Sequence, residues 1–199
     1  MSLRATIYVM STSFEQALKE RILVIDGSMG VLLQLKVRTE EAYRGERFAN
    51  HHKDLRNNTE ALLLHSPDFI QDVHEQYLAA GADIIETCTF TANSIAQEDY
   101  DLSQYVREMN LEAARIARDA ANKFATLDRP RWVAGGIGPC NRSASVIIDA
   151  SRPEVRGVSF DQLRESYREQ ALALIDGGVD LLLIETTFDT LNLKAALFA

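Results

Sequence analysis

GADIIETCTF (residues 81–90) and GVDLLLIETTF (residues 178–188) are two similar segments of this chain. Each begins with a glycine, continues as a short apolar run, and ends in Glu-Thr followed by a phenylalanine. A glycine before a short, continuous Ile/Leu run is typical of a helix end followed by a strand that is buried on both faces, as in a parallel sheet. The resemblance between the two segments therefore predicts a repeated helix-and-strand unit.

Two further apolar runs have the same character, so the chain contains four predicted strands. They are RILVID (21–26), ADIIE (82–86), RWVAGGI (131–137) and DLLLIE (180–185). Apolar residues at spacings of three and four fill the intervals with amphipathic helices, and a new helix is expected near Asp189. Ser66-Pro67 and the pair Ser159 and Gln162 are typical of helix starts, and Gly81 and Gly177-Gly178 of helix ends.

This alternation of strands and helices predicts an α/β fold with a parallel sheet. A (β/α)8 TIM-type barrel explains units that end alike, but it needs about 250 residues and eight strands. With 199 residues and four strands, we expect only about the first four βα units, truncated in the fourth helix. Residues 1–14 would be an N-terminal extension and residues 15–199 the N-terminal half of the barrel. The alternative is a small doubly wound sheet.

The composition is that of a globular protein and excludes several partners. Hydrophobic residues make up 46% of the chain, and 21 Lys+Arg against 29 Asp+Glu give a net charge of −8. This apolar content argues against disorder, and the acidic balance argues against nucleic-acid binding. No apolar run approaches the roughly 18 residues that cross a membrane. Two cysteines without a signal segment indicate a cytoplasmic protein with free thiols.

Polar and glycine-rich residues follow each predicted strand, where parallel α/β folds place their sites. They are Asp26-Gly27-Ser28-Met29-Gly30, Glu86-Thr87, Gly135-Gly136-Ile137-Gly138-Pro139 and Glu185-Thr186. Asp26 or Thr87 alone could be a helix cap, but capping does not require carboxylates at three strand ends. The glycines do not form a dinucleotide-binding motif. Backbone N–H groups beside carboxylates suit a zwitterion, with its ammonium at Glu185 or Asp26.

Signals for a metal or a nucleophile are weak. His51-His52 stand in a polar loop, and adjacent histidines do not form a helix-spaced ligand pair. Cys88 and Cys140 with a histidine could form a zinc site, but small, partly buried thiols are the favoured interpretation. A thiol-dependent enzyme that uses Cys88 is the weakest hypothesis.

Five segments together resemble the homocysteine-binding domain of cobalamin-dependent methionine synthase, from about residue 15 to the last residue. They are VIDGSMGVLLQ (24–34), RGERFANH (44–51), GADIIETCTFTANSIAQEDY (81–100), VAGGIGPCNRSASV (133–146) and GGVDLLLIETTFDTLNLKAALFA (177–199). The resemblance implies a (β/α)8 barrel and a methyltransferase that makes methionine. In that family, methyltetrahydrofolate methylates cobalamin, and the methyl group then passes to homocysteine, whose sulfur is activated on zinc.

The resemblance also implies roles for individual residues. It places Asp26, Gly27 and Glu185 at the polar end of homocysteine, and Glu86, Thr87, Gly138 and Pro139 in rim segments around the pocket. The other expected substrate-binding residues are Ser28, Met29 and Thr186. The chain departs from the family at Ser28, usually glycine, and at Cys88, usually asparagine.

The resemblance places the zinc ligands outside this sequence. The family's zinc cysteines lie in an Asn-Cys segment and a Gly-Gly-Cys-Cys-Gly motif on later strands, and neither motif occurs here. We therefore expect these cysteines beyond Ala199, the last residue of the chain.

We accordingly expect no catalytic residue, metal or cofactor in this fragment, and no activity of the fragment alone. The rest of the barrel and the folate and cobalamin modules would be partners on the same polypeptide, with a homodimer through exposed barrel edges as an alternative. A homocysteine methyltransferase with a betaine-type or S-methylmethionine-type donor, or a non-catalytic small-molecule-binding α/β module, are the alternative functions.

Overall fold

The computed structural model describes residues 13–199, so most of the predicted N-terminal extension lies outside the described residues. Helix α1 (Phe14–Glu20) begins at Phe14, next to the predicted boundary after residue 14, which stays a prediction. The Ser13 side chain accepts a hydrogen bond from the N–H of Gln16 (3.2 Å) and caps this helix.

The sheet contains three parallel strands in chain order, β1 (Ile84–Glu86), β2 (Trp132–Ile137) and β3 (Leu181–Ile184). Ile84 pairs with Trp132, and Ala134 pairs with Leu181. The run at 21–26, predicted as a full strand, forms only one parallel bridge, between Ile25 and Ile84. Ile25 is 43% exposed, so this segment lies at an edge with little packing against it. The order within the described sheet lacks the reversal that defines a doubly wound fold.

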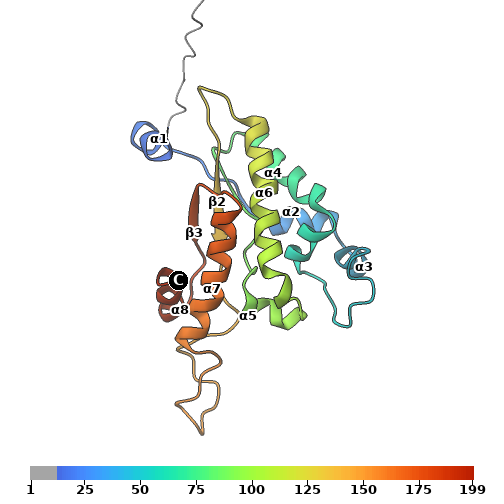
Figure 1. Ribbon diagram of the computed structural model, residues 1–199, viewed down its shortest axis with the longest axis vertical. Helices are drawn as coiled ribbons and strands as arrows, with labels where there is room; N and C mark the ends of the chain where they lie inside the picture. The colour runs from blue at the N-terminus through green and yellow to red at the C-terminus, as the bar shows by residue number, and fades with distance from the viewer. Residues whose placement is uncertain (1–12) are drawn as a thin grey trace, which may run out of the picture.

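Helices follow each strand and form a layer against one face of the sheet (Figure 1). The remaining helices are α2 (Met29–Lys36), α3 (Glu40–Arg44), η1 (Thr59–Leu64), α4 (Pro67–Ala80), α5 (Ser94–Gln97), η2 (Glu98–Tyr100), η3 (Ser103–Tyr105), α6 (Val106–Phe124), α7 (Phe160–Asp176) and α8 (Thr190–Leu197). Along this layer α4 packs on α6, α6 on α7, and α7 on α8. Within residues 13–199, none of these helices combines the length and the apolar character that crossing a membrane requires.

The opposite face of the sheet is covered where the strands begin. Because side chains alternate along a strand, Ile84, Trp132 and Ala134 share this face. They pack with Ala17 of α1, and the ring of Phe14 meets that of Trp132 edge-on, with 5.6 Å between centroids. Figure 1 shows α1 at this end of the sheet and the long loop that follows β2 at the other. The end of the sheet at which the strands finish is not covered by α1 and can therefore accommodate a binding site.

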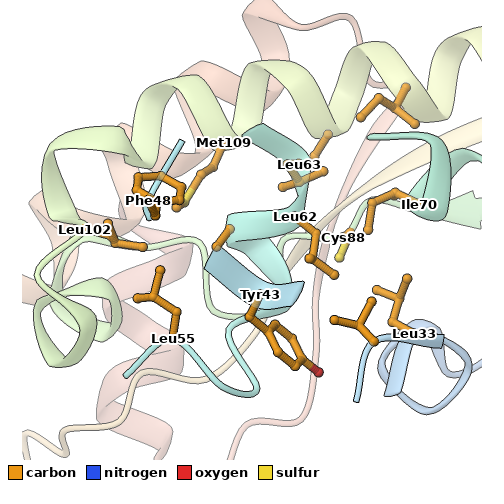
Figure 2. Packing of buried hydrophobic residues seen from close by; sticks show 14 of the residues in the cluster. Leu33, Tyr43, Phe48, Leu55, Leu62, Leu63, Ile70, Cys88, Leu102 and Met109 are labelled. Carbon is orange, nitrogen blue, oxygen red and sulfur yellow. The ribbon is translucent and has the colours of Figure 1, made fainter. Parts of the chain in front are cut away.

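The insert of residues 28–65 packs as a layer of its own beside α4 and α6. Figure 2 shows side chains from α2, α3 and η1 gathered with Ile70 of α4 and Met109 of α6. Leu33 and Tyr43 are fully or almost fully buried in this cluster. Complete burial of such a side chain contributes about 1.5–3 kcal/mol, so the cluster anchors the insert firmly.

Most of the predicted helix signals are confirmed in detail. Ser159 and Gln162 form a capping box at the start of α7, and Gly81 ends α4 in the left-handed conformation, with φ of 113°. Asp189 caps α8, and its carboxylate also accepts hydrogen bonds from Ser145 in the loop after β2. One detail is wrong: Pro67 occupies the first turn of α4 as predicted, but the Ser66 side chain makes no cap.

The repeat in the sequence is also a repeat in the structure, because each copy has an aspartate just before its strand. Asp83 precedes β1, and its Oδ2 accepts a hydrogen bond from the backbone N–H of Val24 (3.1 Å). Asp180 precedes β3, and its Oδ2 accepts one from the backbone N–H of Val133 (2.7 Å). Each carboxylate therefore joins the start of its own strand to the preceding segment of the sheet.

Arginines surround the first of these aspartates. Arg21 donates two hydrogen bonds to Asp83, at 2.8 and 3.0 Å, and the buried Arg131 donates a third at 3.2 Å. Burial alone would raise the pKa of Asp83, but the hydrogen bonds and the positive charge of Arg21 outweigh it and lower that pKa to about 2. A carboxyl with a lowered pKa stabilises the fold above its unfolded pKa, and this contribution is lost as the pH falls.

Substitution of Asp83 tests this ion-pair network. We expect Asp83→Asn to lower the free energy of unfolding by about 3 kcal/mol at neutral pH, because the buried Arg131 loses its charged partner. The difference from the unsubstituted chain should shrink as the pH falls from about 4 to about 2. Urea titration followed by the fluorescence of Trp132 measures both effects. The exposed Asp128→Asn is the control, and an equal loss of stability at all pH values would contradict the assignment.

Candidate functional site

A cavity of about 650 Å³ lies at the end of the sheet where the strands finish. Its wall consists of residues 25–30, Gln34, Asn57, Thr59, Glu60, residues 86–91, Leu183 and Glu185. The wall therefore combines the ends of the edge segment, β1 and β3 with the first turn of α2 and part of the insert. In parallel α/β folds this is the end at which ligands bind.

Three carboxyl groups line this cavity, one each from the edge segment, β1 and the end of β3. Asp26 is held by its backbone N–H, which donates to Ile84 O (2.9 Å), and its Oδ2 accepts from the N–H of Glu86 (3.0 Å). Glu86 is the last residue of β1. Glu185 follows β3, and its N–H donates to Ile137 O (3.1 Å). Parallel pairing thus brings together side chains that are far apart in the sequence.

Gly136 of β2 provides the space in which the Glu86 carboxyl lies. A Cβ atom at this position would collide with Glu86 Oε1. The N–H of Gly136 donates to Thr87 Oγ1 (2.9 Å), and its carbonyl accepts from Thr89 Oγ1 (2.7 Å). The missing side chain at 136 therefore leaves room for Glu86, and the two threonines fix the chain that follows it.

The environment of Asp26 and Glu86 favours the protonated forms of these two carboxyl groups. Burial raises the pKa of Asp26 to about 7, and the negative charge of Glu185 contributes in the same direction. Burial also raises the pKa of Glu86 to about 8, together with a hydrogen bond that its protonated form donates to Glu185 and the negative charges of Glu185 and Asp26. No lysine, arginine or histidine belongs to the described wall of this cavity. A cation that entered it would meet no competing positive charge.

The first turn of α2 brings a different chemistry to the same cavity. Ser28 caps this helix, and Met29 and Gly30 begin it. The first N–H groups of a helix have no partner within it and attract anions. Tyr77 of α4 fixes this turn, because its hydroxyl donates to the Ser28 carbonyl (3.3 Å) and its ring leaves little space at Gly27. The cavity thus has an acidic side and a side that suits a carboxylate.

Sequence reasoning missed Glu60, the cavity's contribution from the insert. Only 2% of this residue is exposed, and its Oε1 accepts hydrogen bonds from the N–H and the hydroxyl of Thr91, at 2.7 and 2.8 Å. Thr59 donates to its Oε2 (3.1 Å). Glu60 thereby connects the insert to the loop after β1. Asn58 caps η1 two residues earlier, and it is the local signal that could have drawn attention to this part of the sequence.

The predicted site residues divide into two groups. Asp26, Gly27, Ser28, Met29, Glu86, Thr87 and Glu185 line the cavity, whereas Gly138, Pro139 and Thr186 do not. Gly138 and Pro139 instead line a very small cavity of about 10 Å³ next to α7 and α8. A Cβ atom at Gly138 would collide with the backbone of Phe90, so this glycine permits a close approach of two loops. Thr186 donates to Glu185 Oε2 (3.1 Å) and so contacts the cavity indirectly.

The two cysteines do not form a metal site. Cys88 lies in the cluster of Figure 2, whereas Cys140 belongs to a different cluster beside α7. Burial raises the pKa of both thiols, which disfavours the thiolate that binds zinc. Among residues 13–199, no group of three His, Cys, Asp or Glu side chains could hold a metal ion. The described residues therefore do not fit a zinc site.

The expected position of the zinc cysteines, beyond Ala199, stays a prediction. Ala199 is partly buried against the apolar cluster beside α7, which also contains Cys140. The last described residue thus belongs to the packing of α7 and α8 and not to the cavity wall.

Comparison with known proteins identifies relatives with this architecture. Structures of the homocysteine methyltransferase MmuM from Escherichia coli match 89% of this chain. The metallated form has 22% sequence identity and a TM-score of 0.63, the oxidised form 24% and 0.65, and the apo form 22% and 0.59. The match covers 58%, 57% and 54% of those chains, respectively, so this chain spans less than two thirds of their length. At this identity the likeness concerns the fold.

The model of the family described as homocysteine S-methyltransferase matches residues 23–199, which include the cavity and all three strands. This match covers most of the sequence and does not depend on the low identity to MmuM. The chain therefore belongs to the homocysteine S-methyltransferase family.

Proposed function

We propose that the cavity binds homocysteine as part of a methionine synthase, which transfers a methyl group to the sulfur of this amino acid. The observation that carries the proposal is the pairing of an acidic side with a helix N-terminus across one cavity of about 650 Å³. An amino acid carries an ammonium and a carboxylate on the same carbon. The two sides of the cavity match these two charges.

The ammonium group would contact Glu185 and Asp26, with Glu86 beside them. The carboxylate would accept hydrogen bonds at Gly27, Ser28 and the first turn of α2. This orientation leaves the thiol end of homocysteine to point away from the acidic side. Among the remaining predicted residues, Thr87 would order the loop after β1. Gly138, Pro139 and Thr186 would shape the rim through their contacts with neighbouring residues.

The methyl acceptor must be a thiolate, because a protonated thiol is a weak nucleophile. The sequence resemblance implies zinc for this purpose, but the residues of the described chain do not fit a zinc site. We therefore derive no step through the metal, and we propose that its ligands come from a part of the polypeptide beyond Ala199. In this proposal the cavity binds and orients the substrate, and this fragment alone is inactive.

The methyl donor is a separate part of the proposal. The segments RGERFANH (44–51) and ETTFDTLN (185–192) resemble methionine synthase more than its betaine-dependent relatives. We therefore propose methyltetrahydrofolate as donor, with cobalamin as carrier, both held by other modules of the same polypeptide. A betaine-type or S-methylmethionine-type donor is the alternative.

We further propose that residues 15–199 form the first half of a (β/α)8 barrel. Parallel strands in chain order with successive helices on one face support this arrangement. β3 has a neighbour on only one side in the described sheet, and Leu182 on this strand is 38% exposed. Further strands, from the same polypeptide or from a second copy, would cover this edge and close the barrel.

Substitution of Glu185 tests the substrate. We expect Glu185→Gln to raise the Kd for L-homocysteine about 10- to 100-fold, because a hydrogen bond to a charged group contributes about 1.5–3 kcal/mol. Isothermal titration calorimetry measures this change. 4-Mercaptobutyrate, which lacks the ammonium, should bind equally to both proteins, and Glu165→Gln on the exposed face of α7 is the control variant. Unchanged affinity for homocysteine in Glu185→Gln would remove this residue from the site.

Metal analysis tests the assignment of the zinc ligands. The purified 199-residue chain, dialysed against zinc and then against buffer, should retain far less than one equivalent, because its thiols are buried and separated. The Cys88→Ala/Cys140→Ala variant should retain the same amount. One tightly bound equivalent that disappears in this variant would contradict the proposal that the metal ligands lie elsewhere.

A further inference from the structure

The carboxyl groups of Glu86 and Glu185 line the same cavity, and they lie close enough for the negative charge of Glu185 to raise the pKa of Glu86. An ionised carboxylate can only accept hydrogen bonds, so a bond between two carboxyl groups requires a proton on one of them. The fold favours this contact: Glu86 lies over Gly136, which has no side chain to separate it from β3, and Glu185 follows β3 directly. Two carboxyl groups that line one cavity without a positive charge in its described wall favour one bound proton over two ionised groups.

No other group in the described cavity wall can neutralise this pair. Asp26 from the edge segment and Glu60 from η1 are also acidic, and Cys88 after β1 is buried with a raised pKa. Helix α2 contributes Met29, Gly30 and Gln34 to the same wall, none of which is charged. Within the described wall the proton is the only available positive charge. A ligand that brings its own positive charge would replace it.

We propose that Glu86 and Glu185 share one proton while the cavity is empty, and that a primary ammonium group displaces this proton when it binds. In this step the O–H bond of the shared carboxyl breaks and the proton passes to the solvent, while no bond of the ligand changes. The net charge of the pair falls from −1 to −2, and the ammonium compensates for the added negative charge. This inference rests on the proposed function, because it takes homocysteine as the ligand.

The shared proton makes Glu86 a specificity-determining residue. A primary ammonium has three N–H donors, which match the three carboxyl groups of Asp26, Glu86 and Glu185. A quaternary ammonium has no N–H donor. It would displace the shared proton and leave the ionised carboxylates without hydrogen bonds in its place. The cavity is therefore selective for amino acids over their fully methylated relatives.

Calorimetry in two buffers of different ionisation enthalpy, phosphate and Tris, measures the released proton at neutral pH. L-Homocysteine should release about one proton on binding to the unsubstituted chain, and its affinity should rise by up to about tenfold per pH unit between about pH 6 and 8. Glu86→Gln should release clearly fewer protons, because its amide donates to Glu185 without a titrating proton and only Asp26 keeps a raised pKa. Glu165→Gln should behave as the unsubstituted chain does. Binding without proton release would overturn the inference while leaving the proposed function intact.

A second measurement decides the inference without any ligand. Infrared spectra of the empty chain at neutral pH, with carbon-13-labelled glutamate, should contain a protonated-carboxyl band that Glu86→Gln removes and Glu165→Gln retains. If homocysteine does not bind but the band is present, the proposed function fails and the shared proton stands. If the band is absent at neutral pH, the shared proton is refuted.

Discussion

Parallel pairing of β1, β2 and β3 is the interaction on which the rest of the structure depends. It directs the ends of all three strands to the same end of the sheet. Glu86 and Glu185, which are 99 positions apart in the sequence, therefore line one cavity. The same pairing is secured at the opposite end by Asp83 and Asp180, each of which accepts a hydrogen bond from a neighbouring segment. A one-residue slip in register would turn every second side chain to the other face. The carboxyl cluster would then no longer form.

The acidic cavity is costly to the fold, and its surroundings offset that cost. Buried carboxyl groups near one another favour protonation, as the raised pKa values of Asp26 and Glu86 indicate. Folding therefore becomes less favourable as the pH rises toward about 8, whereas Asp83 stabilises the chain above about pH 4. The core around the insert supplies the rigidity that holds this arrangement. A ligand that supplies a positive charge would therefore reduce the repulsion among these carboxyl groups and stabilise the folded chain.

Much of the fold could be predicted from the sequence because local signals agree with it. Three apolar runs form strands, and the capping box at Ser159 marks the start of α7. The run at 21–26 looked equally strand-like, but no local pattern reveals that it lies at an edge and forms one bridge. The strand-end rule identified the three carboxyl groups and the start of α2 in the cavity wall. It did not predict that Gly138 packs against Phe90, because the path of a turn depends on tertiary contacts. Glu60 comes from an insert whose packing the sequence did not show.

The central claim is that the cavity holds an amino acid by opposite charges at its two sides. A crystal structure of this chain with bound L-homocysteine tests the claim most directly. Our account predicts the amino nitrogen within hydrogen-bond distance of Glu185 and Asp26, and the carboxylate at Ser28 and the first turn of α2. A ligand bound outside this cavity, or with its carboxylate against Glu86 and Glu185, would contradict the account.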